Sequence, residues 1–225
     1  MKKEEKNREK NKTPWPTKKV MEQVYDINLW GTNGSPFYSG EGSHSSELVN
    51  PYVEVVTTFF KSFEKPLTVC DLGCGDFNVG KALIGFTKRY VAVDIVPDLV
   101  AHNSRQFKAD NLEFHCLDIA VDDLPSGDCA LVRQVLQHLS NAEVQQVLVK
   151  LKAFKYVVLT EHIPEGDFIP NKDIISGQGI RIKKQSGLEV LAAPFSLKPQ
   201  AVQQLLTVQL KKGKGRVVTN LYTMF

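Results

Sequence analysis

Hydrophobic and polar positions along the chain follow two periods, which predict strands and helices in alternation. Five short apolar runs predict buried strands at residues 67–72, 90–95, 112–118, 128–136 and 156–163. Amphipathic segments between them predict helices at residues 79–87, 97–107 and 140–154, the last opened by a capping box of Ser140 and Glu143. Alternating strands and helices form right-handed βαβ units, so we expect a parallel sheet with helices on both faces.

The segments on either side of this alternation follow other patterns. Apolar residues at helical spacing predict a helix over residues 17–29 and a second that starts at Ser46, a candidate cap, with a glycine- and serine-rich loop between them. Residues 163–197 are irregular, and a short helical piece is expected near Pro199. Residues 205–225 form two strands joined at Lys-Gly-Lys-Gly. We therefore predict an α/β fold with a Rossmann-like, seven-stranded, mainly parallel sheet and a C-terminal antiparallel hairpin.

The composition is that of an ordinary soluble protein, with 42% hydrophobic and 24% charged residues among 225. This length suits a single domain, which we place at residues 16–225 behind a disordered basic tail of residues 1–15. Without a long apolar run or a secretory signal, we expect a cytoplasmic protein and no membrane partner. Residues 1–19 hold eight lysine or arginine residues against three glutamates, and the remainder is near neutral. Nucleic acid is therefore not the expected partner, although the tail leaves a docking arm open.

The four cysteines occur singly, in or beside apolar runs. They are Cys70, Cys74, Cys116 and Cys129. Zinc and redox sites typically use a C-x-x-C pair, which this chain lacks. We expect buried free thiols and no metal site.

The first predicted strand ends in a glycine-rich turn, "VCDLGCGDFNVG". Gly73 and Gly75 let the backbone bend and approach a ligand, but a dinucleotide fingerprint would need a third glycine where the chain has Asn78. Asp71 and Asp76 flank the turn, and at ~4 Å each would disfavour a diphosphate by about 4 kcal/mol. The turn therefore favours a cationic ligand without phosphate, such as S-adenosylmethionine.

Acidic residues also follow the second and third predicted strands. Asp94 is placed to accept hydrogen bonds from both hydroxyls of a ribose, and Asp118 to reach an adenine amino group. Ile95 and Ile119, directly after these acids, are placed to sandwich the adenine ring. Each acid could instead cap the following helix, but acids after three successive strands favour a binding site.

Four segments carry a family resemblance: "VCDLGCGDFNVG", "YVAVDIVPDLV", "LEFHCLDI" and "DCALVRQVLQHLSN". They resemble the motifs of class I S-adenosylmethionine-dependent methyltransferases, over about residues 66–160. The chain departs from that pattern at Phe77, where the family has glycine. The resemblance implies S-adenosyl-L-methionine as cofactor, and it adds further cofactor-binding residues to the acids and isoleucines above. These are Asp71, Gly73, Cys74 and Gly75 in the turn, and Arg133 and Gln134 after the fourth strand.

The glycine-rich loop "WGTNGSPFYSGEGSHS", with "VLQHLSN", resembles a subset of small stand-alone bacterial methyltransferases. The resemblance implies that residues 16–64 form a helical lid over the cofactor and that residues 163–197 lie near the substrate site. The lid residues expected to line the pocket are Trp30, Tyr38, Ser39, Gly40 and Ser43. A surface loop without a ligand is the alternative for this segment.

Methyl transfer needs placement of the acceptor, because the sulfonium of the cofactor supplies a neutral leaving group. A base is needed only where the acceptor atom carries a proton. The candidates are His138, His162 and Glu161 near the ends of the fourth and fifth strands, and more remotely His44; a structural histidine is the alternative reading of each histidine. Arg133 could bind an anionic group of the acceptor or hold neighbouring acids.

We therefore expect a methyltransferase that acts on an oxygen or nitrogen atom of a small molecule. One alternative is a methyltransferase for protein or RNA that uses the basic tail as a docking arm. Another is a non-catalytic protein that binds the cofactor or a partner. The sequence leaves a homodimer open.

Overall fold

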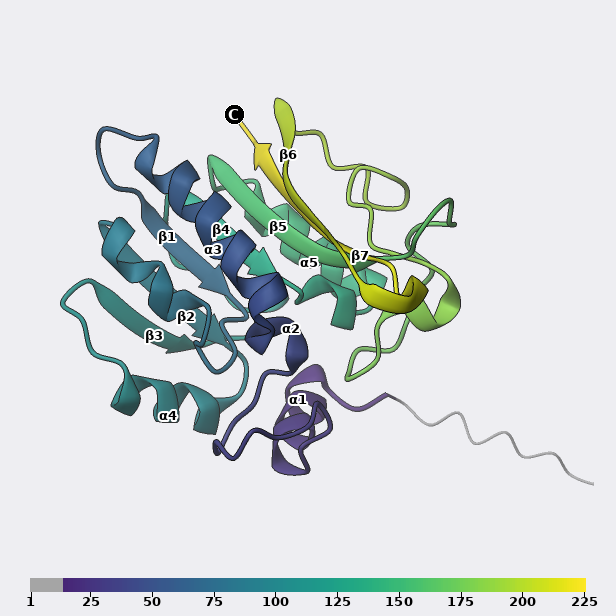
Figure 1. Cartoon of the computed structure of the whole chain (residues 1–225), viewed down its shortest axis with the longest axis horizontal. Coiled ribbons are helices and arrows are strands. Elements are labelled where there is room, and N and C mark those ends of the chain that lie inside the picture. Colours follow the sequence, from purple (N-terminus) through teal and green to yellow (C-terminus); the bar gives the residue numbers. More distant parts are fainter. Residues whose placement is uncertain (1–13) are drawn as a thin grey trace, which may run out of the picture.

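The computed structural model describes residues 14–225, and residues 1–13 of the predicted tail lie outside this range. Its centre is one seven-stranded sheet in the order β3-β2-β1-β4-β5-β7-β6 (Figure 1). The strands are β1 (Thr68–Leu72), β2 (Arg89–Asp94), β3 (Leu112–Cys116), β4 (Cys129–Arg133), β5 (Tyr156–Ile163), β6 (Ala201–Gln209) and β7 (Arg216–Thr223). The first five strands pair in parallel, and β7 is antiparallel to both β5 and β6. The predicted sheet and its C-terminal hairpin are confirmed.

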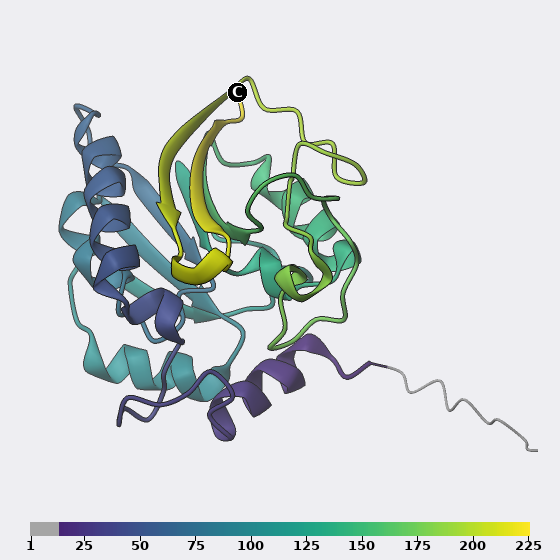
Figure 2. The same cartoon turned by 45° about the vertical axis from the view of Figure 1, so that its right-hand side comes forward.

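Helices cover both faces of this sheet, while one helix lies apart across its carboxyl edge (Figure 2). The helices are α1 (Thr17–Asp26), α2 (Glu41–His44), α3 (Ser46–Lys61), α4 (Pro97–Gln106) and α5 (Asn141–Leu151). Helix α1 is the separate one, and it contacts the start of α4 through Met21, Val24 and Leu99. Since α3 packs against the sheet, only residues 17–44 of the predicted lid lie over the carboxyl edge, and we call these residues the lid.

Two cores form because the central strands bury alternate side chains on opposite faces. Val69 and Leu131 face α3, whereas Cys70 and Val132 face α5. All four side chains are essentially inaccessible to solvent. Burial on both faces explains why these strands appear in the sequence as continuous apolar runs.

The segment after the glycine-rich turn is not the helix predicted at residues 79–87. It forms two short 3-10 turns, η1 (Gly80–Ala82) and η2 (Ile84–Phe86). Gly80 and Gly85 both weaken a helix, and a Cβ at Gly80 would meet the ring of Phe77 at 2.4 Å. The apolar spacing was a misleading signal here, since these side chains pack onto the sheet without a regular helix.

Other predicted boundaries also differ from the structure. No helix occurs near Pro199; the turn in the preceding irregular segment is η4 (Arg181–Lys184). The first helix ends at Asp26, three residues earlier than predicted. The N-cap of α3 is Ser45 and not the predicted Ser46, and the Ser45 side chain makes no capping hydrogen bond. The capping box of Ser140 with Glu143 at the start of α5 is confirmed.

The cysteines are free, as expected, but they are not all buried. Cys70 and Cys129 are buried, Cys74 is partly buried and Cys116, at the end of β3, is exposed. Within residues 14–225, no group of three histidine, cysteine, aspartate or glutamate residues could hold a metal ion. Over the same range, every helix is too short or too polar to cross a membrane.

Candidate active site

A cavity of about 350 Å³ lies at the carboxyl edge of the sheet, beneath the lid. This volume falls at the lower end of the ~300–1,000 Å³ typical of ligand pockets. Strands β1, β2, β3 and β4 end at the cavity, which brings together residues far apart in the sequence. The predicted residues that line it are Trp30, Ser39, Gly40, Ser43, Gly73, Cys74, Gly75, Asp94, Ile95, Asp118, Ile119, Arg133, Gln134 and His138.

The glycine-rich turn forms the floor of the cavity. Gly73 has φ +85° and Gly75 has φ +56°, and a Cβ at Gly73 would meet Val135 at 2.4 Å. The buried carboxylate of Asp94 accepts hydrogen bonds from the Gly75 N–H at 3.0 Å and the Val96 N–H at 3.1 Å. Burial raises the pKa of Asp94, although these backbone donors favour its charged form. The turn and the tip of β2 are thus held together beside the cavity.

Asp118 occupies the tip of β3 in a similar way. One of its carboxylate oxygens accepts the Ala120 N–H at 2.9 Å, so it caps the following turn and lines the cavity at the same time. Ile95 and Ile119 line the cavity next to the two acids. Capping and ligand binding, the two readings of these acids, are therefore compatible in the structure.

Two predicted acids lie elsewhere. Asp71 does not line the cavity; its carboxylate is buried under the turn and accepts the Tyr90 hydroxyl at 2.8 Å. Burial raises its pKa to about 6. Asp76 faces the lid, where its carboxylate contacts Ser39 and His44. The sequence argument was wrong to place these two carboxylates against the ligand, because a tight turn directs neighbouring side chains to different sides.

Phe77, the departure from the family pattern, points away from the cavity. Its φ is +61°, a conformation that residues other than glycine seldom adopt. The ring is fully buried and packs edge-on against three aromatic rings at centroid distances of 4.9–5.7 Å. These rings belong to Tyr90, Phe107 and Phe114. The phenyl group thus anchors the turn in the core and does not form a wall of the cavity.

The end of β4 supplies two polar groups with unused hydrogen-bonding capacity. The Arg133 guanidinium donates to the Gly42 carbonyl at 2.6 Å and lies 4.9 Å from the centre of the Tyr52 ring. Burial lowers its pKa. The Nε of Arg133 and the Oε1 of Gln134 are buried without a hydrogen-bond partner in residues 14–225. Gln134 also has φ +56°, and backbone strain of this kind is common at functional sites.

His138 lines the cavity but has no free nitrogen. Its Nδ1 lies 3.1 Å from the Gly177 carbonyl, which can only accept, so this nitrogen carries the proton. Its Nε2 then accepts from the Gln137 amide at 3.3 Å. Burial lowers the pKa of His138 to about 4. The imidazole is neutral at pH 7 and weakly basic, which disfavours the predicted role as a base.

The structure does not bring His162 or Glu161 to the cavity. The Nε2 of His162 faces the Lys214 carbonyl at 2.6 Å, on the side of the β6–β7 hairpin. Glu161 is buried beneath the irregular segment, and burial raises its pKa to about 8. The structure thus places His162, a predicted catalytic residue, away from the cavity, because it lies within β5 with its ring directed to the β6–β7 hairpin.

The comparisons with known proteins agree with this architecture. Residues 70–154 match the sequence model of a family described as a methyltransferase domain. Among solved structures, the N-methyltransferase NodS of Bradyrhizobium japonicum, in complex with S-adenosyl-L-homocysteine, has a TM-score of 0.65 at 12% identity, covering 90% of this chain and 97% of NodS. Residues 70–154 therefore resemble a methyltransferase domain, and the likeness to NodS shows a shared fold. The predicted resemblance is confirmed over these residues, and the predicted fold over most of the chain.

Two further proteins are similar to this chain. The 1,6-didemethyltoxoflavin-N1-methyltransferase of Burkholderia thailandensis has a TM-score of 0.58 at 15% identity, covering 92% of this chain and 87% of that one. An uncharacterized RNA methyltransferase of Chlamydia pneumoniae is 27% identical over 138 residues, which are 54% of this chain. These residues are 32% of that relative, so the chain spans about a third of its length.

Several residues that line the cavity were not anticipated from the sequence. Thr17, Met21 and Tyr25 come from α1, and Gln178 and Ile180 from the irregular segment. The apolar stripe of α1 could have indicated Met21 and Tyr25, because these side chains lie on the buried face of the helix, which continues into the cavity. Residues 177–180 carried no such signal, since an irregular segment has no periodicity from which its neighbours can be inferred.

Proposed function

We propose that this domain transfers a methyl group from S-adenosyl-L-methionine to an oxygen or nitrogen atom of a small molecule. The observation that carries the proposal is one lidded cavity shared by the glycine-rich turn and two acids at strand tips, Asp94 and Asp118. Residues 16–225 would act as one domain, with residues 163–197 beside the acceptor.

The polar groups of the cavity fit the parts of the cofactor. Asp94 would accept hydrogen bonds from the ribose hydroxyls and Asp118 from the adenine amino group, with Ile95 and Ile119 on either side of the ring. The unpaired Nε of Arg133 would donate to the methionyl carboxylate. The unpaired Oε1 of Gln134 would accept from the methionyl ammonium. A buried donor and a buried acceptor without partners are costly unless a ligand satisfies them, and a zwitterion offers both partners.

The cofactor would supply the electrophilic methyl group, and the chain would supply placement and exclusion of water. Lid residues together with Gln178 and Ile180 line the cavity. They would enclose the acceptor, and such enclosure can lower the barrier by several kcal/mol through orientation alone. Because both nitrogens of His138 are engaged, we assign it to holding the Gly177 backbone and not to proton removal. An acceptor atom that is already nucleophilic at neutral pH suits this site best.

The similar proteins bear on the acceptor in different ways. NodS is an N-methyltransferase, and the Burkholderia enzyme was crystallised with a small heterocyclic acceptor, which supports a small molecule. The Chlamydia relative is described as an RNA methyltransferase, so RNA stays as the second candidate. The basic residues 1–13, which would serve as a docking arm, lie outside the described range. A protein acceptor and a non-catalytic role have no specific observation in their favour.

Calorimetry with S-adenosylhomocysteine and NAD tests the cofactor. We expect the homocysteine derivative to bind at micromolar concentration and NAD to bind at least tenfold more weakly, while the reverse order would overturn the proposal. Formation of S-adenosylhomocysteine with panels of amines, phenols and RNA then separates the acceptors. Cofactor binding without turnover on any panel would favour the non-catalytic reading. RNA turnover that falls when residues 1–14 are deleted, and that falls in the full chain at raised salt, would favour the docking arm. RNA turnover unchanged by both would count against it.

A further inference from the structure

We infer that Asp76 and His44 form a latch that holds residues 39–44 of the lid against the glycine-rich turn and thereby limits how fast the cofactor leaves. This inference rests on the proposed function, since the latch acts on the same cavity. Both are positioning residues: Asp76 does not line the cavity, and neither it nor His44 is placed to contact the reacting atoms.

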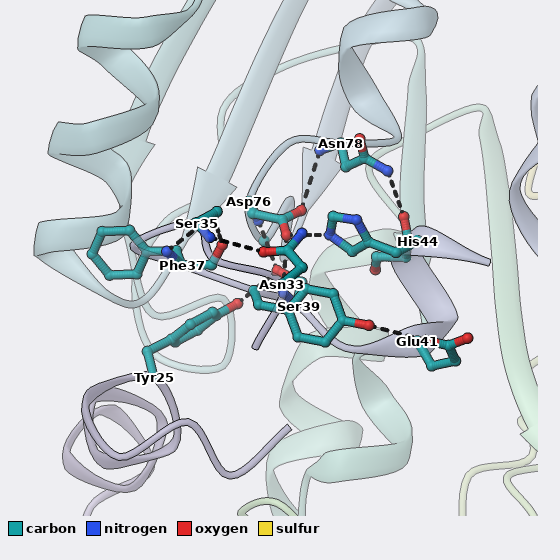
Figure 3. A network of polar contacts seen from close by, with 12 residues as sticks. Tyr25, Asn33, Ser35, Phe37, Ser39, Glu41, His44, Asp76 and Asn78 are labelled. Atoms are coloured by element: carbon teal, nitrogen blue, oxygen red, sulfur yellow. Dashed lines mark hydrogen bonds and ion pairs between the residues drawn. The ribbon is translucent and has the colours of Figure 1, made fainter. Parts of the chain in front are cut away.

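The contacts of Asp76 join two segments that are more than thirty residues apart in the sequence (Figure 3). Its Oδ2 accepts the Ser39 N–H at 2.9 Å and lies 2.6 Å from the Nε2 of His44. Its own N–H donates to the Ser39 hydroxyl at 2.7 Å. The Tyr25 hydroxyl lies 2.9 Å from the same Ser39 oxygen, which extends the network into α1. One carboxylate thus binds the lid through both a side chain and the backbone.

The two sides of this latch differ in how firmly they are held. On the side of the turn, the buried ring of Phe77 fixes the backbone next to Asp76. Asn78 adds a bond between the two sides, since it donates to the Ser43 carbonyl of the lid at 2.8 Å. On the side of the lid, residues 31–36 are all exposed, and Gly31 and Gly34 have φ of +96° and +88°. Such a segment can change its backbone angles at little cost. Opening is therefore expected at the lid and not at the turn.

Asp76 and His44 provide the strongest contact between these residues of the lid and the turn. The side chain of His44 is 23% exposed and that of Asp76 is 9% exposed, so solvent screens their interaction only partly. A hydrogen bond to a charged group is shorter and stronger than one between neutral groups. Arg133 adds a bond to the Gly42 carbonyl of the lid, but Arg133 also lines the cavity. A substitution of Arg133 would therefore change cofactor binding as well as the hold on the lid. Release of the cofactor past residues 39–44 must therefore break the bonds of Asp76.

The test measures dissociation of S-adenosylhomocysteine from the full chain by stopped-flow competition. We expect His44→Ala to accelerate dissociation about tenfold, the effect of losing one charge-assisted hydrogen bond. His44→Gln should restore most of the slow rate, because the Gln amide nitrogen occupies the place of Nε2. His115→Ala is the matched control, since His115 lies on β3 and pairs with Glu113 outside the latch. A purely structural role for His44 would lower the melting temperature without this rescue.

Asp76→Asn and the double variant complete a thermodynamic cycle. If the two residues act together, the double variant should dissociate no more than twofold faster than the faster single variant. Rates that multiply would overturn the latch, as would a His44→Ala rate equal to that of the wild type. His44→Ala also keeps the inference testable if the Asp76 variants fail to fold. Failure of the wild type to bind S-adenosylhomocysteine would instead overturn the proposed function, and the latch with it.

Discussion

The floor and the cover of the cavity are built in different ways. The floor consists of residues 73–75, 94–95, 118–119 and 133–134, and each of these segments lies at or just beyond the carboxyl end of a strand. The cover consists of the lid and residues 177–180. Individual hydrogen bonds hold these segments in place. Gln178, for example, is exposed and donates to the Leu29 carbonyl at 2.6 Å. The floor is therefore fixed by the core and suits a cofactor, whereas the cover can move and is free to differ for each acceptor.

The largest expected effect is the loss of stability on replacing Phe77, whose buried ring anchors the glycine-rich turn of the floor. Phe77→Gly would restore the glycine of the family pattern and relieve an unfavourable backbone angle, which is worth about 1–2 kcal/mol. It would also empty a fully buried aromatic site, which costs about 3–5 kcal/mol or more. We expect a net loss of about 3 kcal/mol in the free energy of unfolding, measured with urea. Phe225→Ala, at an exposed position, should change it by less than about 0.5 kcal/mol. Equal stability of Phe77→Gly and wild type would show that the core does not fix the floor.

A second prediction concerns the support of the cover. Arg181 in η4 donates to the Leu139 carbonyl at 2.9 Å and to Asn141 at 2.7 Å, and Glu161 lies beneath it at the end of β5. Burial raises the pKa of Glu161 to about 8, and the positive charge of Arg181 partly opposes this shift. The stability that Glu161 contributes is therefore complete below pH 4.5 and is lost as the pH rises through 8.

Glu161→Gln cannot ionise and should escape this loss. Urea unfolding at pH 5 and pH 8.5 should show the wild type losing on the order of 3 kcal/mol more than the variant between the two conditions. Asp71 and His138 also have shifted pKa values, but both residues are present in the wild type and in the variant. The difference in pH dependence between the two proteins therefore measures the contribution of Glu161. Parallel pH dependence in the two proteins would mean that Glu161 is not protonated in the folded state.

The difference between floor and cover also explains how far the sequence could be interpreted. Asp94 and Asp118 could be placed because each directly follows an apolar run, so finding the strand located the acid. The same local rule misled for His162, which lies near the end of β5 but directs its ring to the Lys214 carbonyl. It also misled for Asp76, whose carboxylate turns to Ser39 and His44 of the lid.

Contacts over long sequence distances could not be predicted. The Nδ1 of His138 is occupied by Gly177, 39 residues away and within an irregular segment. The sequence therefore showed a histidine near the site but not that its nitrogens were engaged. The same holds for Ser39 and Asp76, whose contact requires the lid to fold back onto the turn.

The third prediction tests the floor as a cofactor site. Asp94→Ala should weaken binding of S-adenosylhomocysteine by about 2 kcal/mol, or roughly 30-fold in Kd by calorimetry, through the lost hydrogen bonds to the ribose. Asp94→Asn keeps an oxygen for the Gly75 N–H but not for the Val96 N–H, so it should lower stability as well as weaken binding. Asp98→Ala, on the exposed first turn of α4, is the control. Unchanged affinity in Asp94→Ala would remove the main support for the cofactor site.

The smallest effects separate the two histidines. His162→Ala should leave turnover and cofactor affinity within about twofold of the wild type, because the His162 ring hydrogen-bonds to the Lys214 carbonyl away from the cavity. His138→Ala should raise KM for the acceptor several-fold with a smaller change in kcat, since it loosens residues 177–180 without removing a base. His138→Asn, whose amide can still donate to the Gly177 carbonyl, should recover much of that loss. A kcat that falls a hundredfold in both His138 variants would instead make the imidazole the base, because a side chain that holds the cover would then take part in the reaction itself.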